Sequence, residues 1–186
     1  MADLIGFAVV SCANASSGVK RICIGRITDL GTETVIGDLV TLDGSGDVTA
    51  ITKETGKLFA EYIFKNDGAS LQMSPTSEND ASSSTNTITM NLGRLTVGTR
   101  DSMNELLQEV GCGLVIGVEL NNDDKFIVGY DNVHGTRRPL TITGGDVNSG
   151  AALKDESKSE LVFSNETTNM PLPCAAAFDF DTDLLA

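Results

Sequence analysis

The sequence predicts a mainly β protein, an antiparallel β-sandwich or barrel with one short flanking α-helix. The composition favours strands and turns, because glycine is abundant (19 residues), aromatic residues make up only 5% and tryptophan is absent. Short apolar or alternating runs recur along the chain between turn-type clusters, and only residues 102–110 have helical periodicity. With 186 residues and 40% hydrophobic content, the chain is expected to form a single β-rich domain over residues 1–186.

Five short runs in the first third of the chain have the composition of strands. Polar or glycine-rich turns separate them, and Asp43-Gly-Ser-Gly-Asp47 is the clearest of these turns. The predicted strands cover residues 4–10, 22–27, 35–42, 48–51 and 58–64.

Residues 74–86 are the one stretch that is too polar and too small-chained to bury apolar surface, so we predict a mobile polar loop there. The next stretch, residues 87–95, alternates in hydropathy, with Ile88, Met90 and Leu92 on one face and polar residues on the other. That alternation predicts a half-buried strand.

The predicted helix has a start signal, an apolar side and a stop signal. Ser102 and Glu105 have the spacing of a capping box, and Gly111 is placed to end the helix in the left-handed conformation. Its apolar residues follow the i, i+3, i+4, i+7 pattern: Met103, Leu106, Leu107 and Val110. A helix this short needs tertiary support, so we expect these four side chains to pack against a sheet.

The second half of the chain predicts more strands and a hairpin. Residues 114–120 and 126–130 flank the turn-type sequence Asn-Asn-Asp-Asp-Lys and should form an antiparallel pair. Residues 139–143 and 160–164 are further strands, with a glycine-rich connection after the first of them. Residues 177–182, in which two phenylalanines alternate with aspartates, predict a terminal strand.

The charge balance argues against a nucleic-acid-binding surface. Thirteen basic and 26 acidic residues give a formal net charge of −13, which repels phosphate. Such a charge suits a surface past which DNA slides without sticking, although a role in solubility is the simpler explanation. No apolar stretch reaches the roughly 20 residues of a membrane span, and the N-terminus lacks the pattern of a signal peptide. We therefore expect no membrane association, and four reduced, buried cysteines.

Candidate catalytic and metal-binding residues are few. The single histidine, His134, has no nucleophile motif around it, and Cys112 follows a predicted helix C-terminus, where the dipole disfavours a thiolate. The Asp179, Asp181, Asp183 spacing resembles the start of a calcium loop but lacks its glycine and late glutamate, so a polar strand face is the preferred interpretation. We expect no enzyme activity, no cofactor and no metal.

From Asn86 onward, the order of elements resembles that of tail tube proteins (major tail proteins) of tailed bacteriophages. The similar features are a strand, the helix Asp101-Ser-Met-Asn-Glu-Leu-Leu-Gln-Glu-Val110, a hairpin that includes Lys125-Phe-Ile-Val-Gly-Tyr-Asp131, and two late strands around Leu140-Thr-Ile-Thr and Leu161-Val-Phe-Ser. The resemblance covers roughly the last hundred residues and carries over no catalytic residue.

The resemblance implies a virion protein of the phage tail, made in the host cytoplasm, whose hexameric rings stack into a hollow tube for DNA. Six copies would carry about −78 charges (6 × −13), which suits a lumen that repels phosphate. The partners would be further copies, other virion proteins and passing DNA that is not tightly bound. Assembly contacts are then expected at the polar segment and at one arginine pair: Ser74, Pro75, Thr76, Ser77, Glu78, Asn79, Arg137 and Arg138.

Two other classes stay open at this point. One is a different phage structural or binding module: a head–tail connector, a capsid decoration protein or a receptor-binding β-domain. A sugar-binding variant is weak because the chain has no tryptophan and only two tyrosines. The other is an enzyme that depends on His134 or Cys112.

Overall fold

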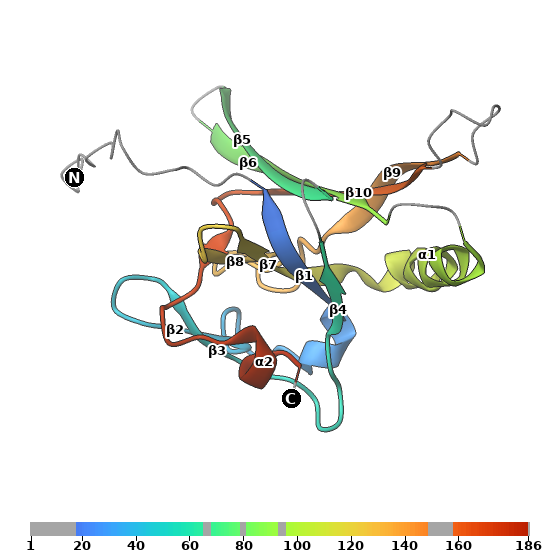
Figure 1. Cartoon of the computed structure of the whole chain (residues 1–186). Helices are drawn as coiled ribbons and strands as arrows, with labels where there is room; N and C mark the ends of the chain where they lie inside the picture. Colours follow the sequence, from blue (N-terminus) through green and yellow to red (C-terminus); the bar gives the residue numbers. More distant parts are fainter. Residues whose placement is uncertain (1–17, 65–67, 79–80, 93–95, 149–157, 186) are drawn as a thin grey trace.

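The computed structural model describes residues 18–64, 68–78, 81–92, 96–148 and 158–185. These residues form three layers, in which a four-stranded sheet and a small third layer lie on opposite sides of a five-stranded sheet (Figure 1). All strand pairs within the sheets are antiparallel. The predicted mainly β antiparallel sandwich with a flanking helix is therefore confirmed.

The five-stranded sheet, called the central sheet below, has the strand order β11-β8-β7-β1-β4. Its strands are β1 (Val19–Arg26), β4 (Ala60–Ile63), β7 (Leu114–Leu120), β8 (Lys125–Val128) and β11 (Leu172–Pro173). The predicted hairpin of residues 114–120 and 126–130 is confirmed by the pairing of β7 with β8.

The four-stranded sheet, called the outer sheet below, has the order β5-β6-β10-β9. It consists of β5 (Ala69–Glu78), β6 (Ala81–Asn91), β9 (Thr141–Asn148) and β10 (Lys158–Thr167). One face packs on the central sheet through Ile88, Met90, Leu161 and Phe163. These side chains are buried between the two sheets, in the core that is called the first core cluster below.

The third layer consists of short elements that cover the other face of the central sheet. They are the 3₁₀ helix Ile27–Leu30, the hairpin of β2 (Val40–Leu42) and β3 (Val48–Ile51), and the C-terminal helix α2 (Phe180–Asp183). Leu30, Val48 and Phe180 are fully buried in the second core cluster between this layer and the central sheet. As predicted, the turn that begins at Asp43 joins β2 to β3, with Gly46 at a φ of 91°.

Burial on both faces explains the near-continuous apolar sequence of β7. Leu114, Ile116 and Val118 point into the first core cluster, and Val115 points into the second. Gly117 also faces the second cluster, where a Cβ atom would lie 2.9 Å from Leu184 and 3.1 Å from Phe180, so the helix α2 can pack closely on this strand.

The main helix is present but begins earlier than the sequence suggested. Helix α1 covers Val97–Glu109 and is followed by a 3₁₀ turn at Val110–Cys112. Thr96 is the N-cap, because its Oγ1 accepts a hydrogen bond of 3.1 Å from the N–H of Thr99. The prediction of a capping box at Ser102 is therefore wrong, and Gly113, with a φ of 76°, takes the left-handed position assigned to Gly111.

The predicted apolar side of α1 is only partly correct. Met103 and Leu106 are both 6% exposed and belong to the first core cluster. Leu107 is 50% exposed, so its assignment to the packed side is wrong, because the helix lies at the margin of the sheet and buries only a narrow stripe. The side chain of Val110 lies outside what the structure describes.

The predicted mobile loop at residues 74–86 is wrong, because most of this segment is strand. Ser74, Pro75, Thr76, Ser77 and Glu78 continue β5 and pair with residues 81–85 of β6. Threonine and serine are compatible with a strand whose faces do not both need apolar side chains, and the antiparallel ladder satisfies the backbone. Asn79, also predicted as an assembly contact, lies outside the described residues.

Three further predictions need correction. Residues 177–182 contain no strand: Asp179 instead caps α2 by accepting a hydrogen bond of 3.1 Å from the N–H of Asp181. Gly144 and Gly145 lie within β9, and most of the predicted strand 35–42 is a turn held by the carboxylate of Asp38. The predicted strand at residues 4–10 lies outside the described residues.

Candidate functional site

The outer sheet is the candidate functional surface, because among the described residues no strand pairs with either of its edges and one of its faces is exposed. β5 and β9 are its terminal strands, and each pairs with only one neighbour in the sheet. Figure 1 shows the outer sheet extending beyond the central sheet at both ends. Open strand edges of this length present unpaired backbone groups to any matching strand.

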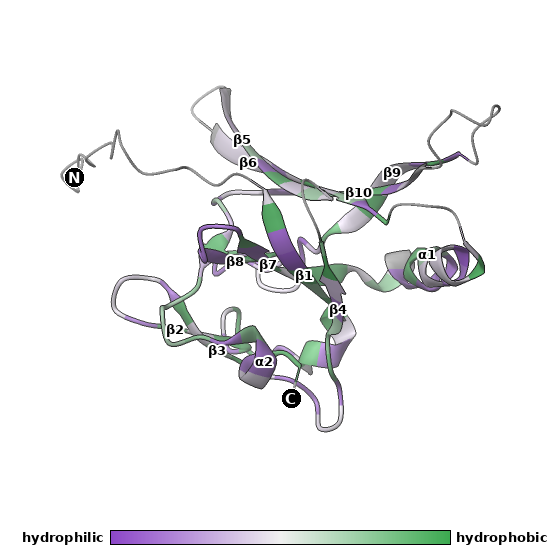
Figure 2. Ribbon diagram, in the orientation of Figure 1, coloured by the Kyte–Doolittle hydropathy of each residue, from purple (hydrophilic) through white to green (hydrophobic). Residues whose placement is uncertain are grey.

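The exposed face of this sheet, called the open face below, carries polar side chains. Along each strand these residues alternate with those that point into the core, so cross-strand rows such as Ser70, Thr89, Val162 and Gly144 form the face. Its members on the two central strands and on β5 are mainly hydroxyls and amides: Ser70, Gln72, Ser74, Thr76, Thr85, Thr87, Thr89, Asn91 and Ser164. Figure 2 shows the distal part of the β5–β6 hairpin in white and pale purple.

The charges on the open face are acidic. Glu160 and Asp146 face each other across β10 and β9, and Glu166 lies at the other end of β10. No strand residue whose side chain the structure describes on this face is basic, and Arg138, in the loop before β9, lies at its margin beside Glu166. The face therefore offers hydrogen-bonding groups and negative charge, which together disfavour tight binding of a polyanion.

The free edge of β5 has a defined pattern of outward backbone groups. The N–H of Asn91 donates to the carbonyl of Gly68 over 2.7 Å, which makes these two residues a hydrogen-bonded pair. By antiparallel alternation, Leu71, Met73 and Pro75 then direct their backbone groups away from β6, to the open side. Pro75 is compatible with this position because its missing N–H costs no bond to β6.

Beyond the apolar core, the inner face of the outer sheet becomes a buried polar network. Asn86 donates through Nδ2 to Asn165 Oδ1 over 3.2 Å and to Thr167 Oγ1 over 3.0 Å, and Ser84 donates to Asn86 Oδ1 over 3.1 Å. Asn165 in turn donates to the carbonyl of Arg138 over 2.8 Å. These mutually satisfied groups fix the register of β6 against β10 where apolar packing no longer does.

The two arginines predicted as assembly contacts are exposed and lie in the loop before β9. Arg137 and Arg138 form no ion pair with another described residue. Arg138 lines a small polar hollow together with Ser83, His134 and Glu166. The structure thus brings Arg138 beside Ser83 of β6, whose hydroxyl lies 3.0 Å from that of Thr76 in β5.

The side chains considered for catalysis, His134 and Cys112, lie in a loop and in the 3₁₀ turn after α1. His134 lies in a loop, where its Nε2 is 2.7 Å from Thr168 Oγ1 and its backbone N–H donates to the carboxylate of Asp131. Burial raises the pKa of Cys23 and of Cys174 to about 12, so both are neutral thiols at pH 7. Cys112 is exposed, contrary to the expectation of buried cysteines, because the 3₁₀ turn after α1 carries it to the surface.

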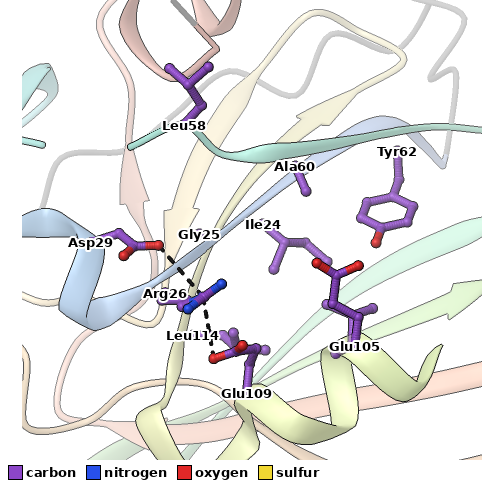
Figure 3. A pocket seen from close by; sticks show the side chains of 11 residues that line it. Ile24, Gly25, Arg26, Asp29, Leu58, Ala60, Tyr62, Glu105, Glu109 and Leu114 are labelled. Carbon is purple, nitrogen blue, oxygen red and sulfur yellow. Dashed lines mark ion pairs between the residues drawn. The ribbon is translucent and has the colours of Figure 1, made fainter. Parts of the chain in front are cut away.

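A hollow between β1, β4 and α1 is the other pocket of note (Figure 3). Ile24, Ala60, Tyr62, Leu106 and Leu114 form an apolar lining. Acidic side chains lie at its margin, where Glu109 and Asp29 both pair with Arg26, at 3.3 and 3.7 Å. Burial raises the pKa of Tyr62, and the charge of Glu105 makes a smaller contribution in the same direction. The titratable groups that line the pocket are Arg26, Tyr62 and three carboxylates, those of Asp29, Glu105 and Glu109.

A partly buried ion-pair cluster around Arg21 was not anticipated from the sequence. Arg21 pairs with Glu119, with Glu61 at 3.1 Å and with Asp181 at 2.7 Å, and the hydrogen bond from Arg21 holds the pKa of Asp181 below its usual value. These acidic residues lie 40, 98 and 160 positions from Arg21 in the chain. Only the strand order could have revealed the cluster, because no local pattern links residues so far apart.

Comparison of the chain with protein-family models, with curated proteins and with solved structures gives no match. In the described ranges, no three His, Cys, Asp or Glu side chains are grouped as a metal site would require. No helix of those ranges has the length and apolar character needed to cross a membrane.

Proposed function

We propose that this protein is a self-assembling structural subunit of a bacteriophage tail tube. Copies join edge to edge through the outer sheet, so that β5 of one copy pairs with β9 of the next and the ring closes. The open face then lines a central channel for DNA, and α1 and the central sheet form the outside. The number of copies, six, comes from the resemblance to tail tube proteins.

The observation that carries the proposal is the outer sheet itself. It is a four-stranded antiparallel sheet with both edges open, one face in the core and the other face polar. A contact between two different edges of the same sheet is heterologous, and such contacts close into rings when the rotation between copies allows it. Pairing would also satisfy the backbone groups that each edge leaves open.

The chemistry of the open face supports the second part of the proposal. A DNA conduit must not hold phosphate, and the described strand side chains of the open face are mainly hydroxyls, amides and carboxylates. The net charge of −13 adds a repulsive field that is multiplied in a ring. Under this proposal the partners are further copies and other virion proteins, and DNA passes without tight binding.

The experiment that tests this proposal changes one outward backbone N–H of β5. Met73→Pro removes that N–H without removing a bond to β6, whereas Met73→Ala shortens the same side chain and keeps the N–H. We expect the wild-type protein and Met73→Ala to form rings by light scattering and electron microscopy, and Met73→Pro to remain monomeric with an unchanged circular dichroism spectrum. Rings of folded Met73→Pro, or a wild-type protein that stays monomeric, would contradict the proposal.

A further inference from the structure

The edge of the central sheet at β4 is open, and it lies beside an apolar hollow. β4 is the last strand of the sheet and pairs only with β1. The hollow between β4 and α1 is lined by Ala60, Tyr62 and Leu106, with Leu58 at one end (Figure 3). Leu58 is 56% exposed, and Ile63, on the opposite face of β4, is 71% exposed.

Backbone groups of β4 point to this open side at defined positions. The N–H of Phe64 donates to the carbonyl of Lys20 over 3.0 Å, so Phe64 is hydrogen-bonded to β1. By antiparallel alternation, Tyr62 and Ala60 are hydrogen-bonded to β1 as well. Glu61 and Ile63 are the alternate residues, and their N–H and C=O groups are directed away from β1. An added strand would therefore find both hydrogen-bonding groups and apolar side chains along this edge.

The opposite end of the central sheet does not offer a comparable edge. β11 has only two residues, one of which is Pro173, and the N–H of Cys174 donates to the carbonyl of Lys125 over 2.9 Å. The N–H of Ala175 donates to the carbonyl of Val48 over 2.9 Å, which ties this end to β3. β4 is thus the long open edge of the central sheet within the described residues.

The chain itself supplies a segment of matching chemistry. Residues 4–10, Leu-Ile-Gly-Phe-Ala-Val-Val, are apolar at every position, which is typical of a strand that is covered on both faces. Residues 1–17 lie outside the described part, and β1 begins at Val19, beside the end of β4. The seven residues 11–17, Ser-Cys-Ala-Asn-Ala-Ser-Ser, are small and mostly polar, as a connection would be.

The length of the connection fits docking within one copy. Seven extended residues span about 23 Å at ~3.3 Å each. A strand on the far side of β4 lies two strand spacings from β1, which is about 10 Å. Because Val10 must stay near the start of β1, and β1 is antiparallel to β4, the docked segment would run parallel to β4.

We propose that residues 4–10 bind to the β4 edge of their own copy as a sixth strand of the central sheet. The larger side chains Ile5, Phe7 and Val9 fill the hollow beside α1, and the intervening residues cover the face of Ile63. The consequence for assembly is direct: with β4 covered, the long open edges among the described strands are those of the outer sheet. The proposal does not depend on the tail tube function.

Hydrogen exchange at single-residue resolution tests this binding. Phe7→Asp places a charge in an apolar hollow whose margin is already acidic, whereas Ser16→Asp places the same charge in the connection. In the full-length Phe7→Asp protein we expect the amides of Glu61 and Ile63 to exchange about tenfold faster or more, with Tyr62 unchanged because its amide is bonded to β1. Equal exchange of Glu61 and Ile63 in wild type, Phe7→Asp and Ser16→Asp would overturn the proposal.

Cross-linking tests whether the segment comes from the same copy. In a Cys12→Ser, Cys112→Ser background, Ala8→Cys and Ile63→Cys, which the proposal places on the same face, should be joined by a short thiol cross-linker into a species with the mass of one chain. The control pair Ala8→Cys and Ser45→Cys, with the second thiol in the β2–β3 turn, should not cross-link. Cross-linked dimers would show that a second copy supplies the segment, and they would overturn docking within one copy, as would the absence of any cross-link.

Discussion

Arg21 on β1 and Glu119 on β7 form an ion pair in directly opposed positions of the central sheet, and the carboxylate is only 4% exposed. The guanidinium is 14% exposed, lies 5.5 Å from the centre of the Phe180 ring and also pairs with Glu61 and Asp181. One side chain therefore joins β1, β4, β7 and the C-terminal helix α2. These contacts hold α2 against the central sheet, on which the outer sheet packs.

Replacing Arg21 should cost far more than replacing its exposed neighbour. Arg21→Met leaves the buried Glu119 with only Lys20 as a partner, and we expect the free energy of unfolding to fall by about 3 kcal/mol. Lys20→Met should cost less than about 1 kcal/mol, because Lys20 is half exposed. Urea unfolding of both variants checks this, and equal losses would show that Glu119 does not depend on Arg21.

The two adjacent leucines of α1 form a matched pair for testing how the helix packs. Leu106→Asp places an unpaired charge in the first core cluster and should lower the free energy of unfolding by about 4 kcal/mol. Leu107→Asp should change it by less than about 1 kcal/mol, since that side chain is half exposed. Thermal unfolding distinguishes the two, and a folded Leu106→Asp protein of wild-type stability would contradict the observed packing.

Acid should weaken the loop contacts that Glu33 makes. Burial by itself raises the pKa of Glu33, but the hydrogen bonds from Thr136, Tyr130 and Gly37 outweigh it, so the pKa lies below the ordinary 4.5. A carboxyl whose pKa is lower in the folded state stabilises the protein above the unfolded-state pKa, and this stability is lost as the pH falls through the folded-state pKa.

Glu33→Gln should therefore be less stable than the wild type by about 1 kcal/mol at pH 7, and the difference should shrink below pH 4.5. Denaturant unfolding at several pH values measures it. A difference that stays constant from neutral pH to acid would mean that ionisation of Glu33 contributes nothing to folding.

The sequence predicts the class of fold well, because a strand that is buried on one face shows alternating apolar and polar residues. That alternation can be read from a few consecutive residues without knowing the partner strand. The prediction of a loop at residues 74–86 is wrong because a strand in a sheet with an exposed face needs few apolar residues. The strand that pairs with it cannot be identified from the sequence of this segment alone. The C-terminal residues 177–182 alternate like a strand, but the carboxylate of Asp179 caps a helical turn, and Phe178 and Phe180 are buried side by side.

The candidate site was only partly within reach of sequence reasoning. A β-rich chain is expected to have open sheet edges, but the sequence does not show which strands form them. The order of strands depends on pairs that are far apart in the chain, such as β6 and β10. The predicted contacts at residues 74–78 lie on one terminal strand of the outer sheet. Arg137 and Arg138 could not be placed relative to them, because the loop that carries them is positioned by Asn165 of β10.

The β9 edge offers a second, independent test of assembly. Val147 lies on this terminal strand and is exposed, so Val147→Lys places a charge on the edge, which is how natural sheets prevent pairing. We expect Val147→Lys to be folded and to need a protein concentration about tenfold higher or more before rings form. Val147→Thr should form rings at the same concentration as the wild type. Unimpaired rings of Val147→Lys would exclude β9 from the contact between copies.

Electron microscopy of the purified full-length protein at high concentration is the most direct test of a subunit that closes through its outer sheet. The expected images are rings, or stacked rings, with an axial channel bounded by the strands of the outer sheet. A protein that remains monomeric under these conditions, or that forms particles in which α1 faces the axis and the outer sheet faces the solvent, would contradict the proposed architecture.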